Sequence, residues 1–332
     1  MNNLRVGLVG AGSIARTHAP AWRELGAELF VFAPKLAKEL AEEQGGTEVA
    51  SMAELFDRVD VIDICSPTSS HADIATAALR ADRDVVCEKP LTRTVDEGKG
   101  LMALAGERGR RLLPGHVVRY FPQYVQAKTA IDAGRVGKVA VLRFSRTAPF
   151  PSAAWFADDA ASGGIILDQM IHDIDQAVWM AGPVKKVYAT EHRVETAQRR
   201  VRTAHAVLTH ESGAISHCRG LWGAPGTEFS CTFHVAGTGG ILEHDSRKAT
   251  GIELDIAVRS TVPPEDAHLP SFAMGANPYS LEIQDFFRTI TTGSTPRVDA
   301  RDGLRAVELS IAIIQSIHSG CPLTISNERD VQ

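Results

Sequence analysis

A short apolar stretch of this chain, GGIILDQMIHDID at residues 163–175, carries three aspartates and a histidine. In a helix, Asp168 and His172 stand four residues apart and Asp175 follows three residues later, so these three side chains share one face. Three interpretations compete: a solvent-exposed amphipathic helix, a metal site of histidine and carboxylates, and an acid/base pair in which Asp168 orients His172. The stretch alone leaves them open.

A second candidate site follows the first predicted strand, where residues 10–15 read GAGSIA. Here Gly10 permits a tight turn, Gly12 lets the backbone approach a pyrophosphate, and Ala15 lets helix and strand pack closely. Glycine turns of this kind also occur for purely structural reasons. The order of strand, loop, helix and second strand favours a dinucleotide site that includes Ser13 and Ile14.

The end of the second predicted strand bears on the choice of cofactor. An enzyme that uses NAD usually places Asp or Glu there to bind the ribose hydroxyls, whereas this chain reads Phe32-Ala33-Pro34-Lys35. Lys35 could meet a 2′-phosphate, or it could simply be solvated. We therefore expect NADP, with NAD as the alternative.

Polar residues also follow the third and fourth predicted strands. Ser66-Pro67-Thr68 comes after one strand, and Glu88-Lys89-Pro90 comes after the other. Ligands of an open parallel sheet bind at the carboxyl ends of its strands, so both segments should line the cofactor site. Lys89 could donate a hydrogen bond to an alcohol or carbonyl oxygen, or it could form a surface ion pair with Glu88.

Composition narrows the class of protein. The 332 residues suffice for two domains, and a hydrophobic content of 44% with 23% charged residues is typical of a globular protein. A net charge of -5 gives no reason to expect nucleic acid. The five scattered cysteines include no C-x-x-C, and no membrane span or signal peptide is evident. We expect a cytoplasmic protein that binds no membrane.

Short apolar runs alternate with helical patterns in residues 1–118, which predicts a Rossmann domain with a doubly wound parallel sheet. Ser51-x-x-Glu54 and Thr94-x-x-Glu97 predict capping boxes at two helix starts. The predicted strands are residues 5–9, 28–32, 60–65, 84–87 and 111–117.

The pattern changes in residues 119–332, which we interpret as an α+β domain for substrate binding and oligomerisation. Its extended runs are joined by short turns, so the last three should form an antiparallel meander in an open, mainly antiparallel sheet. Residues 260–277 are expected to form a surface loop. The predicted strands are residues 139–147, 186–194, 203–209, 214–222 and 229–236, and the predicted helices are residues 123–133, 278–292 and 300–319.

These motifs together resemble the Gfo/Idh/MocA oxidoreductases, the glucose-fructose oxidoreductase and inositol dehydrogenase group. The resemblance includes GAGSIA, SPTSSH at residues 66–71, EKP at 88–90, Arg119 with Pro122, GGIILDQMIHDID, and the segment from Tyr279 to Phe286. It spans nearly the whole chain in the expected order. The combination of EKP with D-x-x-x-H is more specific than the glycine loop.

The resemblance implies a nicotinamide-dependent dehydrogenase or reductase acting on a polyol, sugar or cyclitol, with Lys89, Asp168 and His172 in the catalytic positions. It implies association through the open sheet face, as a homodimer or homotetramer. The sequence departs from the pattern at residues 33–35 and at His116, where asparagine is frequent. The implied cofactor-binding residues are Gly10, Gly12, Ser13, Ile14, Ala33, Lys35, Ser66, Pro67, Thr68, His71, Glu88 and Lys89.

In such an enzyme His172 would accept the hydroxyl proton, Asp168 would orient the ring, and Lys89 would stabilise the alkoxide. We expect no metal, because no second His/Cys cluster is spaced to complete a cage. Two other functions stay open: a non-catalytic sensor of dinucleotide or sugar, and an NAD-dependent glycosidase without net redox. Further substrate contacts are expected from Arg119, Tyr120, Trp155 and Tyr279, each of which could equally be a packing residue.

Overall fold

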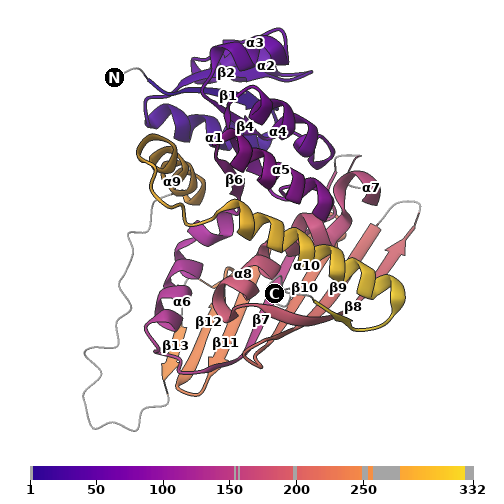
Figure 1. Cartoon of the computed structure of the whole chain (residues 1–332). Helices are drawn as coiled ribbons and strands as arrows, with labels where there is room; N and C mark the ends of the chain where they lie inside the picture. The colour runs from indigo at the N-terminus through magenta and orange to yellow at the C-terminus, as the bar shows by residue number, and fades with distance from the viewer. Residues whose placement is uncertain are drawn as a thin grey trace. The chain divides into compact units, whose positions relative to one another are not determined.

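The computed structural model describes residues 3–152, 155, 158–196, 200–248, 253–256 and 277–325. Its chain divides into two compact units (Figure 1). The first contains Met1–Tyr120 with Gly275–Val307, and the second contains Phe121–Met274 with Glu308–Gln332. We expected a single boundary at residue 118. The structure instead returns Gly275–Val307 to the first unit.

A six-stranded sheet forms the centre of the first unit, with the order β3-β2-β1-β4-β5-β6 and parallel pairing throughout. Strands β4 and β5 are buried at every residue, as a parallel sheet covered on both faces requires. The strand order reverses between β1 and β4, which is where such sheets bind ligands. The strands are β1 Arg5–Val9, β2 Glu28–Phe32, β3 Thr47–Glu48, β4 Val61–Ile64, β5 Asp84–Glu88 and β6 Leu112–Gly115.

The helices of this unit begin largely where the sequence predicts. Thr94 and Glu97 form a complete capping box, whereas Ser51 accepts from the Glu54 amide while the Glu54 carboxylate accepts from Ala50. The helices are α1 Ser13–Glu24, α2 Ala37–Gln44, α3 Met52–Arg58, α4 His71–Arg80, α5 Val95–Arg108 and α9 Pro278–Thr292, with the short helical turns η1 Thr68–Ser70 and η2 Val117–Tyr120.

Helix α9 belongs to the first unit because of its apolar face. Ile283 and Phe286 are fully buried in the same core as Leu8, Val31 and Trp22. Burial of these side chains stabilises the return by roughly 1.5–3 kcal/mol for each side chain. The unit boundary then falls inside α10, Ala300–Ser319.

The second unit contains an eight-stranded sheet with the order β13-β12-β11-β7-β10-β9-β8-β14. It is mainly antiparallel, as expected, but the predicted meander is wrong at one place. Strand β7 lies between β10 and β11 and runs parallel to β10. A central position pairs both edges of this long strand, which would otherwise expose unpaired amides and carbonyls.

Strand lengths in this sheet are close to those expected, and β12, β13 and β14 were not predicted. The strands are β7 Val139–Pro149, β8 Val184–Glu195, β9 Arg200–His210, β10 Ile215–Gly223, β11 Ser230–Gly237, β12 Gly240–Asp245, β13 Glu253–Ile256 and β14 Leu323–Thr324. The loop expected at residues 260–277 lies outside the described residues, apart from Asn277, which caps α9.

Helices cover one face of the second sheet, α6 and α8 among them (Figure 1). Along β7 the buried side chains Leu142, Phe144 and Arg146 alternate with the less buried Arg143 and Ser145. The helical segments of this unit are α6 Pro122–Asp132, α7 Asp159–Ser162, the π-helical turn η4 Ile166–Met170, and α8 Ile171–Ala181. Among the described helices, none is long and apolar enough to cross a membrane.

Candidate active site

The glycine loop between β1 and α1 has the geometry of a phosphate cradle. Gly10 has a φ of +112°, and a Cβ there would lie 2.7 Å from the Cys65 carbonyl oxygen, so only glycine fits. At Gly12 a Cβ would meet nothing within 4 Å. Gly12 also begins α1, whose first amides receive no side-chain cap. The loop therefore offers an open helix N-terminus that a pyrophosphate can approach.

Ala15 is buried in the core behind this loop, and Ser13 and Ile14 begin the helix. The end of β2 is joined to the same turn, because the Gly10 amide donates to the Phe32 carbonyl at 2.9 Å. Beyond it the chain places Ala33, Pro34 and the exposed Lys35 where a ribose-binding carboxylate would stand.

The loops after β4 and β5 are held together by His71. Its Nδ1 lies 2.8 Å from the Pro90 carbonyl oxygen and its Nε2 lies 2.9 Å from the Ser66 carbonyl oxygen. Burial, the largest influence, lowers the pKa of His71. The ring is enclosed. We therefore correct its expected role: His71 positions the backbone of both loops, whereas Ser66, Pro67 and Thr68 belong to the loop itself.

Glu88 and Lys89 do not fit the alternative of a surface ion pair, because Glu88 is only 7% exposed. Its Oε2 accepts a hydrogen bond from the Lys89 backbone amide at 3.1 Å. Lys89 is partly exposed at the carboxyl end of β5. The cofactor residues expected from the first unit thus gather at the carboxyl ends of β1, β2, β4 and β5.

The stretch from residue 163 to 175 lies in the second unit and contains a π-helical turn followed by the start of an α-helix. Gly163 and Gly164 take positive φ angles of 73° and 63°, and the chain then forms η4 before continuing as α8. Asp168 lies in η4 and His172 in the first turn of α8. Both side chains are partly exposed, whereas Met170 and Ile171 between them are buried.

The other two aspartates of this stretch are buried. Asp175 was expected to share the polar face, but it is enclosed and accepts from Gln176 Nε2 at 3.3 Å. Asp173 forms a buried ion pair with Arg146 on β7, with 2.8 Å between Nη2 and Oδ1. Burial raises the pKa of Asp173 in spite of the Arg146 charge. Asp173 therefore anchors α8 to the sheet, and the role of Asp168 and His172 as an acid/base pair stays a prediction.

Two expected substrate contacts are corrected by their burial. Arg119 is 3% exposed, and its guanidinium pairs with Asp302 at 3.0 Å and donates to the Arg297 carbonyl. The Tyr120 hydroxyl donates to Asp285 Oδ2 at 2.8 Å. Asp302, Arg297 and Asp285 all lie in residues 275–307, so both side chains hold that segment on the first unit.

The remaining substrate candidates have different surroundings. The Tyr279 ring packs on the His18 ring, with 5.9 Å between their centroids. Trp155 is partly buried, and its immediate neighbours lie outside the described residues. A substrate contact from either residue stays a prediction.

Sequence reasoning missed a buried group of ionisable residues in the first unit: His18, Asp63 and Glu282, which adjoin Glu88. His18 follows the glycine loop on the buried face of α1, three residues after Ala15. The spacing of His18 from the glycine loop could have indicated that it is buried beside the cofactor loop. The position of Glu282, in the segment from Tyr279 to Phe286 that carries the family resemblance, was a second signal.

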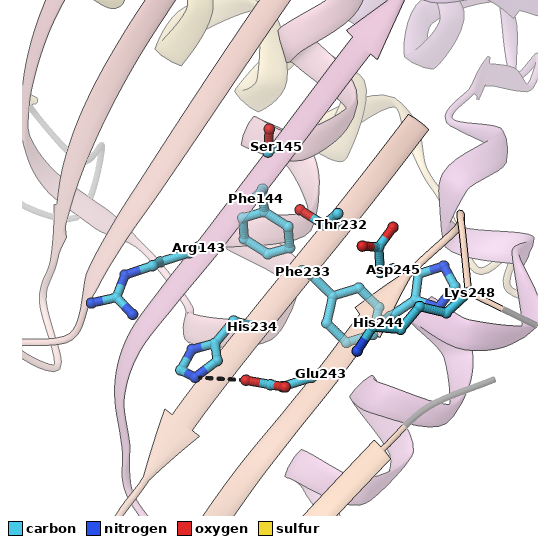
Figure 2. Close-up of a pocket in the computed structure, with 10 residues that line it drawn as sticks. All are labelled: Arg143, Phe144, Ser145, Thr232, Phe233, His234, Glu243, His244, Asp245 and Lys248. Carbon is cyan, nitrogen blue, oxygen red and sulfur yellow. Dashed lines mark ion pairs between the residues drawn. The ribbon is translucent and has the colours of Figure 1, made fainter. Parts of the chain in front are cut away.

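A hollow of 390 Å³ lies on the second sheet and is lined by residues of β7, β11 and β12 (Figure 2). Phe144, Phe233 and His244 are buried there, and His234 Nε2 lies 3.3 Å from Glu243 Oε1. None of the residues expected to carry chemistry lines it. The hollow is therefore not lined by the residues for which a catalytic role is predicted.

The residues present fit a dinucleotide. The cradle of Gly10 and Gly12 can receive the pyrophosphate, Lys35 can meet the ribose, and Lys89 stands at the same sheet edge. These residues of the first unit can together bind a nicotinamide dinucleotide. In the second unit, Asp168 and His172 are side chains of the types that form an acid/base pair.

Known proteins resemble the chain over nearly its full length. Two family models match it: an oxidoreductase family with an NAD-binding Rossmann fold over residues 4–116, and the GFO/IDH/MocA C-terminal domain over residues 124–243. Inositol 2-dehydrogenase from Rhizobium meliloti (strain 1021) is 28% identical, and the match covers 95% of this chain and 97% of that protein.

D-xylose 1-dehydrogenase (NADP(+)) 2 from Haloferax volcanii is 27% identical, and that match covers 87% of this chain and 88% of the relative. Among solved structures, levoglucosan dehydrogenase in complex with NADH and L-sorbose has a TM-score of 0.86. It is 22% identical, and the match covers 98% of this chain and all of the other, so this likeness speaks for the fold.

Proposed function

The chain belongs to the Gfo/Idh/MocA oxidoreductase family, and from this premise we propose that it transfers hydride between a nicotinamide cofactor and a sugar, cyclitol or related polyol. The reacting group is a secondary alcohol or its ketone. The observation that carries the proposal is that the dinucleotide cradle and Lys89 lie at one edge of the first sheet. The named activities of the relatives support the same substrate class.

The bound nicotinamide supplies the hydride acceptor for alcohol oxidation. His172 accepts the proton of the substrate hydroxyl, because a neutral imidazole is a base of suitable strength near neutral pH. Asp168 orients the ring and stabilises the imidazolium that results. Lys89 donates to the substrate oxygen as negative charge develops on it. In the reductive direction the same His172 returns the proton.

We further propose that NADP is preferred over NAD. Lys35 is exposed at the end of β2, and residues 33–35 contain no carboxylate. The preference should be modest, because it rests on one lysine. Titration of both cofactors under identical conditions measures it, and a clear preference for NAD would contradict this interpretation of the loop.

A two-step experiment tests the function. A thermal-shift screen of sugars and inositols with each cofactor first identifies ligands, since binding stabilises the folded state by mass action. Turnover of the ligands is then followed by nicotinamide absorbance, and net reduction of the cofactor is expected. Binding without turnover would indicate a sensor, and a cleaved glycoside without net absorbance change would indicate a glycosidase.

The face of the second sheet opposite its described helices supports a proposal about assembly. Tyr188 and Ile215 are each 40% exposed, and the strand register places both on this face. We propose that two or four copies associate through it. The cytoplasmic location expected from the sequence stays a prediction.

A further inference from the structure

Four ionisable side chains from four elements meet inside the first unit, directly behind Lys89. They are His18 on α1, Asp63 on β4, Glu88 at the end of β5, and Glu282 on α9. None is more than 7% exposed. Apart from Glu88, they have no part in the function proposed above, and a buried charged group is costly unless it is paired.

His18 has the surroundings of an imidazolium. Its Nδ1 lies 3.0 Å from Asp63 Oδ2, and its Nε2 lies 3.4 Å from Glu88 Oε1. Burial alone would lower the pKa of His18, but the Asp63 carboxylate outweighs it, so the pKa is raised well above its usual range. Trp22 Nε1 also donates to Asp63 Oδ2, at 2.8 Å. The Asp63 carboxylate therefore interacts with both His18 and Trp22.

The Glu282 carboxyl, in contrast to that of Asp63, has no hydrogen bond among the described residues to offset the cost of its burial. It is fully buried, and neither of its oxygens has a hydrogen-bond partner among the described residues. A carboxyl oxygen of Glu282, a ring nitrogen of His18 and a carboxyl oxygen of Glu88 lie within 4.8 Å of one another. Three carboxyls thus surround one imidazole. If all three were ionised, the single positive charge could not balance them.

Among the described residues, Asp285 also acts on Glu282 and is itself paired with Arg288, three residues further along α9. Asp285 accepts from the Tyr120 hydroxyl, and burial raises the pKa of the Cys65 thiol to about 12, so the thiol stays neutral. Tyr279 presents its ring to His18. Burial and the Glu88 carboxylate raise the pKa of Glu282 well above the usual range.

Glu88 connects this group to the proposed catalytic lysine. Its Oε2 accepts from the Lys89 amide, while its Oε1 faces His18. A Cβ at Gly115 would lie only 3.1 Å from Oε1, so β6 closes the other side. The orientation of the Glu88 carboxylate therefore decides where the Lys89 backbone is held.

We propose that Glu282 is a positioning residue. Its carboxyl has no hydrogen-bond partner among the described residues but lies within 4.8 Å of a Glu88 oxygen; as a neutral carboxylic acid it donates to Glu88 after a small side-chain rotation and so fixes the carboxylate that holds Lys89. The effect on turnover rests on the proposed function, whereas the protonation of Glu282 rests on this geometry alone. The two parts can be tested separately.

The pH dependence has a definite sign. A carboxyl that keeps its proton in the folded state but loses it when unfolded, above about pH 4.3, makes the folded state bind more protons. The free energy of unfolding then falls as pH rises towards the raised pKa of Glu282. His18, whose pKa is also raised, loses its contribution in the same direction. A variant that changes only Glu282 leaves the His18 contribution in place.

Glu282→Gln keeps a neutral donor of the same shape and removes the titration. Its melting temperature should therefore match the wild type near pH 4.5 and exceed it by a margin that grows up to about pH 9. At saturating cofactor its turnover should stay within about threefold of the wild type, while Glu282→Leu, which removes the donor, should lose on the order of ten- to a hundredfold in kcat. Glu39→Gln, at an exposed position on α2, is the matched control and should change neither quantity.

The melting measurement needs no substrate, so it separates the two proposals. A melting difference between Glu282→Gln and wild type that is constant across this pH range would overturn the neutral Glu282. So would a stoichiometric divalent metal in the purified wild type that Glu282→Gln lacks, because a cation would then balance the carboxylates. A wild-type chain that oxidises no alcohol would contradict the proposed function instead, with the melting curves still deciding the state of Glu282.

Discussion

At the scale of single residues, Lys89 offers the sharpest test of the proposed chemistry. Its backbone is held by the buried Glu88, and its side chain stands at the edge of the sheet where the cofactor is expected. Lys89→Ala should lower kcat about a hundredfold or more and change dinucleotide affinity little, because its donor acts on charge that develops in the transition state. Lys38→Ala, at a lysine that is 71% exposed, is the control. Turnover within a factor of two or three of wild type would assign Lys89 a structural role only.

His172 and Asp168 are the second test at this scale. His172→Ala should cost roughly a hundred- to ten-thousandfold in turnover. Asp168→Asn should cost less, because it keeps a polar partner but loses the charge that stabilises an imidazolium. Rates of alcohol oxidation in the wild type should rise with pH as His172 loses its proton. His318→Ala, at an exposed position on α10, should leave the rate unchanged. Activity abolished by a chelator and restored by zinc would favour a metal site.

At the scale of elements, two glycines in the turn between β1 and α1 are expected to have different roles, one in dinucleotide binding and the other in stability. A Cβ at Gly12 would meet nothing within 4 Å among the described residues, so Gly12→Val should fold normally and lose dinucleotide binding by obstructing the pyrophosphate. Gly10→Val should instead lose stability, because its φ is positive and its Cβ would press on the Cys65 carbonyl. Calorimetric titration and thermal melting of the two variants check this contrast. Unchanged affinity in Gly12→Val would exclude this loop as the binding site.

A second prediction at this scale concerns the ion pair that attaches α8 to the sheet. Arg146 and Asp173 are both buried, and removal of one partner leaves the other charge uncompensated. Either Arg146→Met or Asp173→Asn should lower the free energy of unfolding by about 3–5 kcal/mol. The double variant Arg146→Met/Asp173→Asn should lose less than the sum of the two, as a double-mutant cycle in urea can measure. Additive losses would show that the pair is not coupled.

At the scale of the whole molecule, the sheet face that carries the exposed Tyr188 and Ile215 predicts self-association. Sedimentation velocity should find two or four copies of the wild-type chain. Tyr188→Asp combined with Ile215→Asp should shift the population towards monomers, because two charges would be desolvated at the interface. Leu36→Asp, at a residue that is 51% exposed on the first unit, is the matched control. A wild-type monomer at every concentration would contradict the proposal.

The sequence by itself determined the bounds of many strands and helices of this protein. The bounds of β1, β2, α9 and α10 agree with those predicted, and the glycine loop stands between strand and helix as expected. Periodicity of apolar residues and helix capping act within a few residues, so they can be deduced without the fold. The motif residues also sufficed to predict the family that the comparisons then confirmed.

Only the tertiary structure decided which distant residues meet. The insertion of β7 beside β10, the return of α9 to the first unit, and the burial of Arg119 and Tyr120 against residues 275–307 all join parts of the chain far apart in sequence. So does the group of His18, Asp63, Glu88 and Glu282, which four separate elements bring together. A residue's type and local spacing do not state its burial or its partners, and in this protein those partners separate the side chains that hold the fold from those left for chemistry.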